Sequence, residues 1–171
     1  MSFDLTEGGE QMQFRIISIP PFQAVSSGVD PNQDFSESGG LGKFNAYFSK
    51  LEPGPRDRFM PRDFLYYDAE QEGLVWIYAL TEGMDPEDYK VIDFEGGMYL
   101  TYHYKDGDHE ENARLYQEAM TWIAQSEFFE LDQRADHYPM GHIITPPEVI
   151  KATGEAQMEA FIPIKLKDNE V

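Results

Sequence analysis

The chain has 171 residues, with 13 Lys and Arg against 32 Asp and Glu, and its formal net charge is −19 at pH 7. That charge argues against direct binding to nucleic acid or to an anionic membrane surface, because both partners require neutralising cations. The absence of cysteine excludes a disulfide scaffold and thiolate-ligated zinc or iron–sulfur centres. The length suits one domain over residues 1–171, and 12 Phe, 10 Tyr and 2 Trp supply its core.

The sequence predicts neither a secretory signal nor a membrane-spanning segment. Residues 1–13 are polar and acidic, without the basic and apolar regions of a secretory signal. The longest continuous apolar run, residues 74–80, is far shorter than the roughly 20 residues that span a bilayer. We therefore expect a cytoplasmic protein that does not bind membranes.

The first half of the chain predicts a strand, a helix and two more strands. Leu41, Phe44, Phe48 and Leu51 recur at helical spacing, and a Pro-Gly-Pro sequence follows them. The predicted elements are a strand over 14–19 with an extended continuation over 22–29, a loop over 31–40, a helix over 41–51, and strands over 63–68 and 73–81. Because the last of these is apolar on both faces, it is expected to be a central strand.

The second half repeats this order. Asp108, followed three residues later by Glu111, resembles a helix capping box. The predicted elements are an extended segment over 89–94, a strand over 98–104, a helix ending near 126–128, strands over 137–145 and 157–166, and a short helical segment over 148–153. Two repeats, over about 13–82 and 88–167, would pair about a pseudo-twofold axis with a ligand cleft between them. An α+β domain without internal symmetry is the alternative.

A search for catalytic and cofactor motifs is negative. The chain contains no nucleotide-binding glycine motif, no zinc-protease motif and no nucleophile elbow. The four histidines, at positions 103, 109, 137 and 142, do not have the spacing of a standard metal site. The sequence therefore predicts no cofactor, no metal and no assigned catalytic residue, although His142 is notable because it lies inside an apolar predicted strand.

Aromatic rings and carboxylates on the predicted strands are the most informative chemistry. Trp76 and Tyr78 share one strand face, whereas Tyr99 and Tyr102 lie on opposite faces of their strand. Glu159 shares a face with Phe161 in the last strand. Rings beside a carboxylate can hold a lipophilic cation through cation–π attraction and charge pairing. The alternative is that the rings belong to the core and that the carboxylate faces water.

Several segments resemble the gyrase-inhibitor-like (GyrI-like) effector-binding domains. They are residues 14–25, 73–80, 96–103 and 159–165, the last with the sequence Glu-Ala-Phe-Ile-Pro-Ile-Lys, and residues 141–149 are similar to one subgroup of stand-alone members. The resemblance covers about residues 14–167. It implies an α+β, SOUL-like fold of two strand–helix–strand–strand repeats, with a cleft for drug-like, often cationic effectors. Since no helix-turn-helix unit precedes the first strand, it implies a stand-alone ligand binder rather than a DNA-binding protein.

The resemblance also identifies candidate site residues. An ungapped alignment from Phe161 places Gly141 at the family's key Glu, whereas a gapped alignment places Asp136 and Tyr138 at its Glu and Tyr. Glu159 matches the family's closing-strand Glu. The predicted ligand-binding residues are Trp76, Tyr78, Tyr99, Tyr102, Asp136, Tyr138, His142 and Glu159.

Three functional hypotheses follow. The first is a binding module for a hydrophobic or amphipathic, cationic small molecule. The second is a hydrolase of cyclopropane-bearing reactive molecules, as some stand-alone relatives are, with a carboxylate as general base and a Tyr or His142 as proton donor. Glycine at the family's Glu position argues against it. The third is an acidic interaction protein that binds a basic surface of a DNA-handling partner. The sequence does not predict the oligomeric state.

Overall fold

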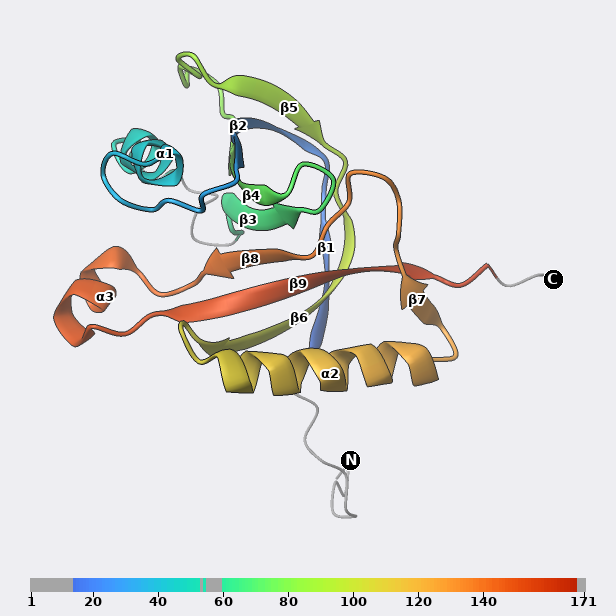
Figure 1. Ribbon diagram of the computed structural model, residues 1–171. Coiled ribbons are helices and arrows are strands. Elements are labelled where there is room, and N and C mark those ends of the chain that lie inside the picture. The colour runs from blue at the N-terminus through green and yellow to red at the C-terminus, as the bar shows by residue number, and fades with distance from the viewer. Residues whose placement is uncertain (1–13, 53, 55–59, 169–171) are drawn as a thin grey trace.

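The computed structural model describes residues 14–52, 54 and 60–168. In these ranges the chain forms a nine-stranded antiparallel sheet and three helices (Figure 1). The first half holds β1 (Arg15–Ile19), β2 (Phe22–Asp30), α1 (Gly40–Phe48), β3 (Asp63–Asp68) and β4 (Gly73–Ala79). The second half holds β5 (Lys90–Phe94), β6 (Gly97–Lys105), α2 (His109–Gln125), β7 (Phe129–Leu131), β8 (Met140–Ile143), α3 (Pro147–Thr153) and β9 (Gln157–Leu166).

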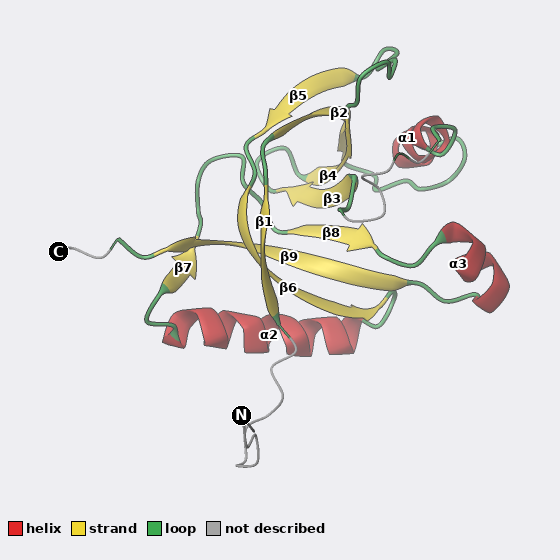
Figure 2. Ribbon diagram, turned by 180° about the vertical axis from the view of Figure 1, so that it is seen from behind, coloured by secondary structure: helices red, strands yellow, loops and turns green. Residues whose placement is uncertain are grey.

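The sheet curls back on itself, as Figures 1 and 2 show. Its strand order is β1-β6-β9-β8-β3-β4-β2-β5, with β7 paired to β9. β1 continues into β2 through Pro20 and Pro21, and β5 continues into β6 through Glu95 and Gly96. Because β1 pairs with β6 while β2 pairs with β5, the two bent segments run along each other. Gly96 has a φ of +71°, and a Cβ there would lie 2.3 Å from the carbonyl oxygen of Ile19, so the crossing requires glycine.

The two halves have the same order of elements and meet at the centre of the sheet. Each half contributes a bent strand, a helix and two further strands. β3 of the first half pairs with β8 of the second through Leu65–Gly141 and Tyr66–Met140. This arrangement confirms the predicted α+β fold of two pseudo-symmetric strand–helix–strand–strand repeats. β7 and α3 are additions to the second half.

Each long helix covers the outer face of one half. α2 packs against β6 and β7, and side chains of β9 belong to the same apolar cluster (Figure 1). Its buried residues Leu115, Ala119 and Ile123 pack with Leu100 and Ile162. The Asp108 side chain accepts a hydrogen bond from the Glu111 amide at 3.0 Å, which confirms the predicted cap.

α1 covers β2 and β4 in the same way. Its buried residues Leu41, Phe44 and Tyr47 form the apolar stripe of the helix, and Phe44 and Tyr47 pack with Val25 and Tyr78. The helix ends at Phe48 instead of reaching Leu51, because the chain then tightens into a turn in which the Leu51 amide donates to the Phe48 carbonyl.

The inner face of the curled sheet holds a third apolar cluster. Its fully buried rings are Phe64, Tyr99 and Phe161, with Ile77 and Met140 packed among them. A buried side chain of this size contributes about 1.5–3 kcal/mol to stability relative to its exposed state. The cluster occupies the middle of the inner face and leaves the two ends to polar groups.

The predicted strand over 137–145 is wrong in extent. Regular pairing covers only Met140–Ile143, because Pro139 has no N–H to donate and the preceding residues form a loop. The short strand β7 was not predicted, since three residues are too few for a periodic pattern.

Candidate ligand pocket

An open pocket of about 510 Å³ lies at one end of the inner face. Its walls come from both halves: β2, β3 and β4 of the first, and β5 with the loop between β7 and β8 of the second. The volume falls within the range of roughly 300–1,000 Å³ that is usual for small-molecule sites.

A β-bulge shapes the wall that β2 provides. The register of β2 against β4 shifts between Ser26 and Val29, and Gly28 has a φ of +72°. The Gly28 amide donates to the Ser26 hydroxyl at 3.1 Å, and the Trp76 amide donates to the Ser27 hydroxyl at 2.9 Å. These side-chain hydrogen bonds satisfy backbone donors near the bulge, so the strand bends at the pocket without losing them.

The opposite wall carries two stacked aromatic rings. The rings of Tyr66 on β3 and Tyr138 on the β7–β8 loop lie 5.4 Å apart with an interplanar angle of 11°. Burial and the nearby Asp68 carboxylate raise the pKa of Tyr66 to about 12. The same two causes, in the same order, raise the pKa of Tyr138. Both phenols are therefore neutral near pH 7 and offer ring faces without a negative charge of their own.

Carboxylates lie beside these rings. The Asp68 carboxylate accepts hydrogen bonds from the amides of Glu70 and Gln71, at 2.9 and 3.0 Å, and is held in place by the β3–β4 turn. Asp136 is exposed, has a φ of +55°, and makes no hydrogen bond or ion pair with another described residue. Asp93, Glu95 and Lys90 also line the pocket. Rings together with an excess of carboxylates produce a site suited to an organic cation.

Arg134 anchors the loop that brings Asp136 and Tyr138 to the pocket. Its guanidinium donates to both carboxylate oxygens of Asp132, to Glu95 at 3.0 Å and to the carbonyl of Gly96 at 3.1 Å. Asp132 is buried, which alone would raise the pKa of its carboxyl, but the hydrogen bonds from Arg134 outweigh burial and lower it. The loop is thereby fixed to the bend between β5 and β6.

His137 fills the space behind this anchor. Its Nε2 lies 3.3 Å from Arg134 and 3.6 Å from Asp132, and its ring packs 5.5 Å from that of Tyr99. Burial and the positive charge of Arg134 lower the pKa of His137 below its ordinary value. The imidazole is therefore neutral near pH 7.

The structure brings together only some of the predicted site residues. Asp136 and Tyr138 line the pocket, and Tyr99 lies behind His137 without lining it. Trp76 and Tyr78 pack on the outer face with Phe48 of α1.

Tyr102 is also remote from the pocket, because it lies under α2 and donates its hydroxyl hydrogen bond to Asn112 at 2.8 Å. Most of the pocket lining was not singled out for binding from the sequence, including Tyr66, Asp68, Lys90 and Phe94. In the sequence, Tyr66 and Phe94 are two of many aromatic residues on predicted strands and extended segments, and Asp68 is the last residue of one such strand, so nothing marks them as ligand-binding.

Glu159 and His142 lie at the other end of the inner face. In the pairing of β8 with β9, Met140, which lines the pocket, lies opposite Phe161. Two residues further along β8, on the same face of the sheet, His142 lies opposite Glu159. Arg15 donates to the buried Glu159 carboxylate at 2.8 Å.

His142 is held on the same side of the sheet. Its Nδ1 lies 3.0 Å from the carbonyl oxygen of Asp63. Gly141, which the ungapped alignment places at the family's Glu, pairs with Ala160, which packs against the apolar cluster beneath α2. A Cβ at Gly141 would meet the Met158 methyl at 2.9 Å. This position therefore tolerates no larger side chain without a shift of Met158.

The described residues offer neither a metal site nor a membrane-spanning helix. In residues 14–52, 54 and 60–168, no three His or acidic side chains are grouped so that they could hold a metal ion. Among the helices in that part of the chain, none has the length and apolar character required to cross a membrane.

Comparisons with known proteins identify the fold. Neither the protein-family models nor the curated proteins contain a match to the chain. Among solved structures, the EcmrR C-terminal domain is 18% identical, with a TM-score of 0.58 over 90% of this chain and 97% of that one. A hydrolase from Listeria innocua is 13% identical, with a TM-score of 0.56 over 90% and 92%. SAV2435 bound to tetraphenylphosphonium is 11% identical, with a TM-score of 0.55 over 90% and 94%. At these identities the likeness shows the fold alone, which is the GyrI-like α+β fold that the sequence predicts.

Proposed function

We propose that the chain binds a hydrophobic organic cation in the pocket between its two halves. The observation that carries this proposal is the stacked pair of Tyr66 and Tyr138 with Asp68 and Asp136 beside it, in a cavity of about 510 Å³. The structure of SAV2435 with tetraphenylphosphonium supports the proposal, because that protein shares the fold and its ligand is a cation of this class. A role related to transcription regulation and a cytoplasmic location remain predictions of the sequence.

The pocket supplies two attractions of comparable size. An aromatic face attracts a cation by about 0.5–2 kcal/mol, with the larger value in a desolvated site. An exposed carboxylate such as Asp136 adds on the order of 0.5–1 kcal/mol. Neither attraction requires a directed hydrogen bond from the ligand, so the site should accept cations of differing shape.

Calorimetric titration with tetraphenylphosphonium tests the proposal. Asp136→Asn removes the charge, keeps the side-chain shape and retains a residue type that tolerates positive φ. We expect this substitution to raise the Kd about two- to fivefold.

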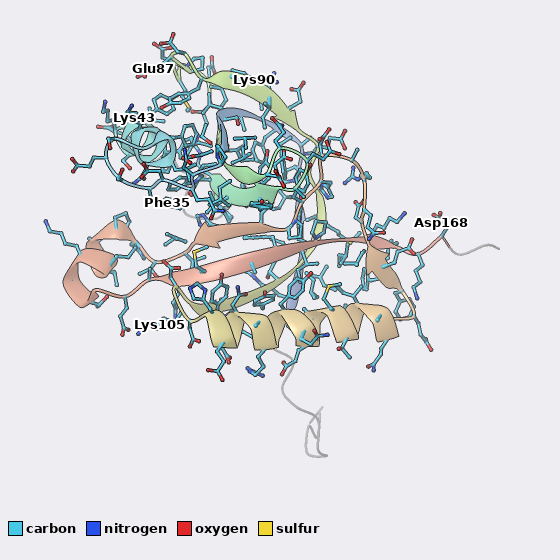
Figure 3. The ribbon with its side chains drawn as sticks, viewed as in Figure 1. Phe35, Lys43, Glu87, Lys90, Lys105 and Asp168 are labelled. Carbon is cyan, nitrogen blue, oxygen red and sulfur yellow. The ribbon has the colours of Figure 1, made fainter. Side chains whose placement is uncertain are left out.

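Asp106→Asn is the matched control. Asp106 follows Lys105, which Figure 3 shows near the start of α2, far from the β7–β8 loop, and it does not line the pocket. The control should bind as the unmodified chain does. Failure of the unmodified chain to bind the cation, or equal losses in both variants, would contradict the proposal.

A further inference from the structure

Lys90 is a lysine among the acidic residues of the pocket wall. It lies at the start of β5 (Figure 3), opposite Ser26 of β2, and shares a strand face with Ile92 and Phe94, which also line the pocket. The Lys90 backbone belongs to the β2–β5 pairing, but its side chain makes no hydrogen bond or ion pair with another residue in the part of the chain that the structure describes. Its ammonium group is therefore available to a ligand.

The two pocket-lining carboxylates that follow Lys90, one in β5 and one directly after it, already have partners. Asp93 accepts a hydrogen bond from the Gln23 amide group at 3.3 Å, and Glu95 accepts one from Arg134 at 3.0 Å. The strands β2 and β4 separate β5 from β3, where Tyr66 and Asp68 lie. The pocket thus has a cationic group on one wall and rings with carboxylates on the other.

We propose that the pocket selects cations that also carry an anionic group, which Lys90 binds while the cationic part lies against Tyr66 and Tyr138. This inference rests on the proposed function and specifies its ligand class. A simple cation gains nothing from Lys90 and is repelled by it, whereas a zwitterion of suitable length pairs both of its charges. Lys90 is then a specificity residue that acts by repulsion as well as by attraction.

A matched pair of probes tests the selection. They are (4-carboxybutyl)triphenylphosphonium and pentyltriphenylphosphonium, which differ only in a carboxylate in place of a methyl group. We expect the unmodified chain to bind the carboxylate probe about two- to fivefold more tightly in calorimetric titrations at equal salt. The net charge of −19 disfavours an added carboxylate everywhere else on the surface, so a preference of this sign requires a local cation.

Two variants complete the test. In Lys90→Gln the preference should disappear, with weaker binding of the carboxylate probe and unchanged or tighter binding of the pentyl probe. Lys43→Gln removes an exposed lysine of α1, outside the pocket, and should keep the preference. Thermal unfolding of both variants should match that of the unmodified chain, because both lysines are exposed.

The outcomes separate this inference from the proposed function. Binding of both probes with equal affinity, or an unchanged preference in Lys90→Gln, would overturn the role of Lys90 and leave cation binding intact. Failure of both probes to bind would overturn cation binding itself, and the role of Lys90 with it.

Discussion

Replacement of Arg134 by Met tests whether its ion pairs hold the pocket loop in place. Methionine keeps an apolar stem of similar length and removes the guanidinium donors to Asp132, Glu95 and the Gly96 carbonyl, whereas the backbone amide of residue 134 still donates to Asp132. Loss of a partner from a buried ion pair costs about 3–5 kcal/mol, and loss of an exposed pair costs below about 1 kcal/mol. The Asp132 side chain is 6% exposed and that of Arg134 is 43% exposed, so this pair lies between the two limits. We expect a loss of about 2 kcal/mol in the free energy of unfolding, or about 4–8 °C in Tm for a chain of this size.

Thermal unfolding and calorimetric titration with tetraphenylphosphonium would measure the two consequences. Glu95→Gln is the control within the same network, because the Glu95 side chain is 69% exposed, and it should change the Tm little. The double variant Asp132→Asn with Arg134→Met should recover part of the lost stability, since it removes the buried charge that has lost its guanidinium partner. A double variant no more stable than Arg134→Met would refute this reasoning. Cation binding should also weaken in Arg134→Met, because the loop carries Asp136 and Tyr138.

Two further predictions concern the groups behind the pocket. The Tyr99 hydroxyl is buried and has no hydrogen-bond partner among the described residues. Tyr99→Phe should therefore raise the Tm, by the equivalent of about 1 kcal/mol, and leave cation binding unchanged. A lower Tm would contradict this expectation. The pKa of His137 is lower in the folded chain than its ordinary value of 6.5, so the unfolded chain binds more protons below that pH, and the free energy of unfolding should fall as the pH drops from 6.5. His137→Asn should flatten this part of the Tm–pH curve. Because the pKa of Asp132 is lowered in the folded chain, protonation of its carboxylate should reduce stability only below about pH 4, in both proteins. Parallel Tm–pH curves above that pH would exclude His137 as the cause.

Sequence patterns predicted the elements that depend on local periodicity. α2 was predictable because apolar residues at helical spacing follow a capping signal at Asp108, although the predicted stripe included Tyr116, which is exposed, and missed the buried Leu115. β9 was predicted with the observed bounds, and the structure places Phe161 and Ile162 on opposite faces, as alternation requires. The fold class followed from the repeated order of such elements.

The pocket was less predictable because it is formed by chain segments that are distant in sequence. Tyr66 and Tyr138 stack only after β3 pairs with β8, and no periodic pattern indicates that contact. Residues 137–139, the end of the loop before β8, were predicted as part of a strand, but Pro139 cannot donate a ladder hydrogen bond. Tyr78 and Tyr102 could not be separated from pocket rings, because the sequence does not say which strand face a helix covers.

The two ends of the inner face differ in how their charges are satisfied, and this difference indicates where a ligand should bind. At one end Glu159 is paired with Arg15, and His142 is held against Asp63, so those polar groups have partners within the chain. At the other end Lys90 and Asp136 have no such partners in the described residues, and the space between them is open. A charged ligand gains binding energy from charged groups that have no partner in the chain. To bind a group that is already paired, the ligand must first displace the existing partner, which costs the energy of that pair. The pseudo-symmetric fold therefore presents two polar ends, and the unpaired charges distinguish the end with the pocket from the end that its own ion pairs occupy.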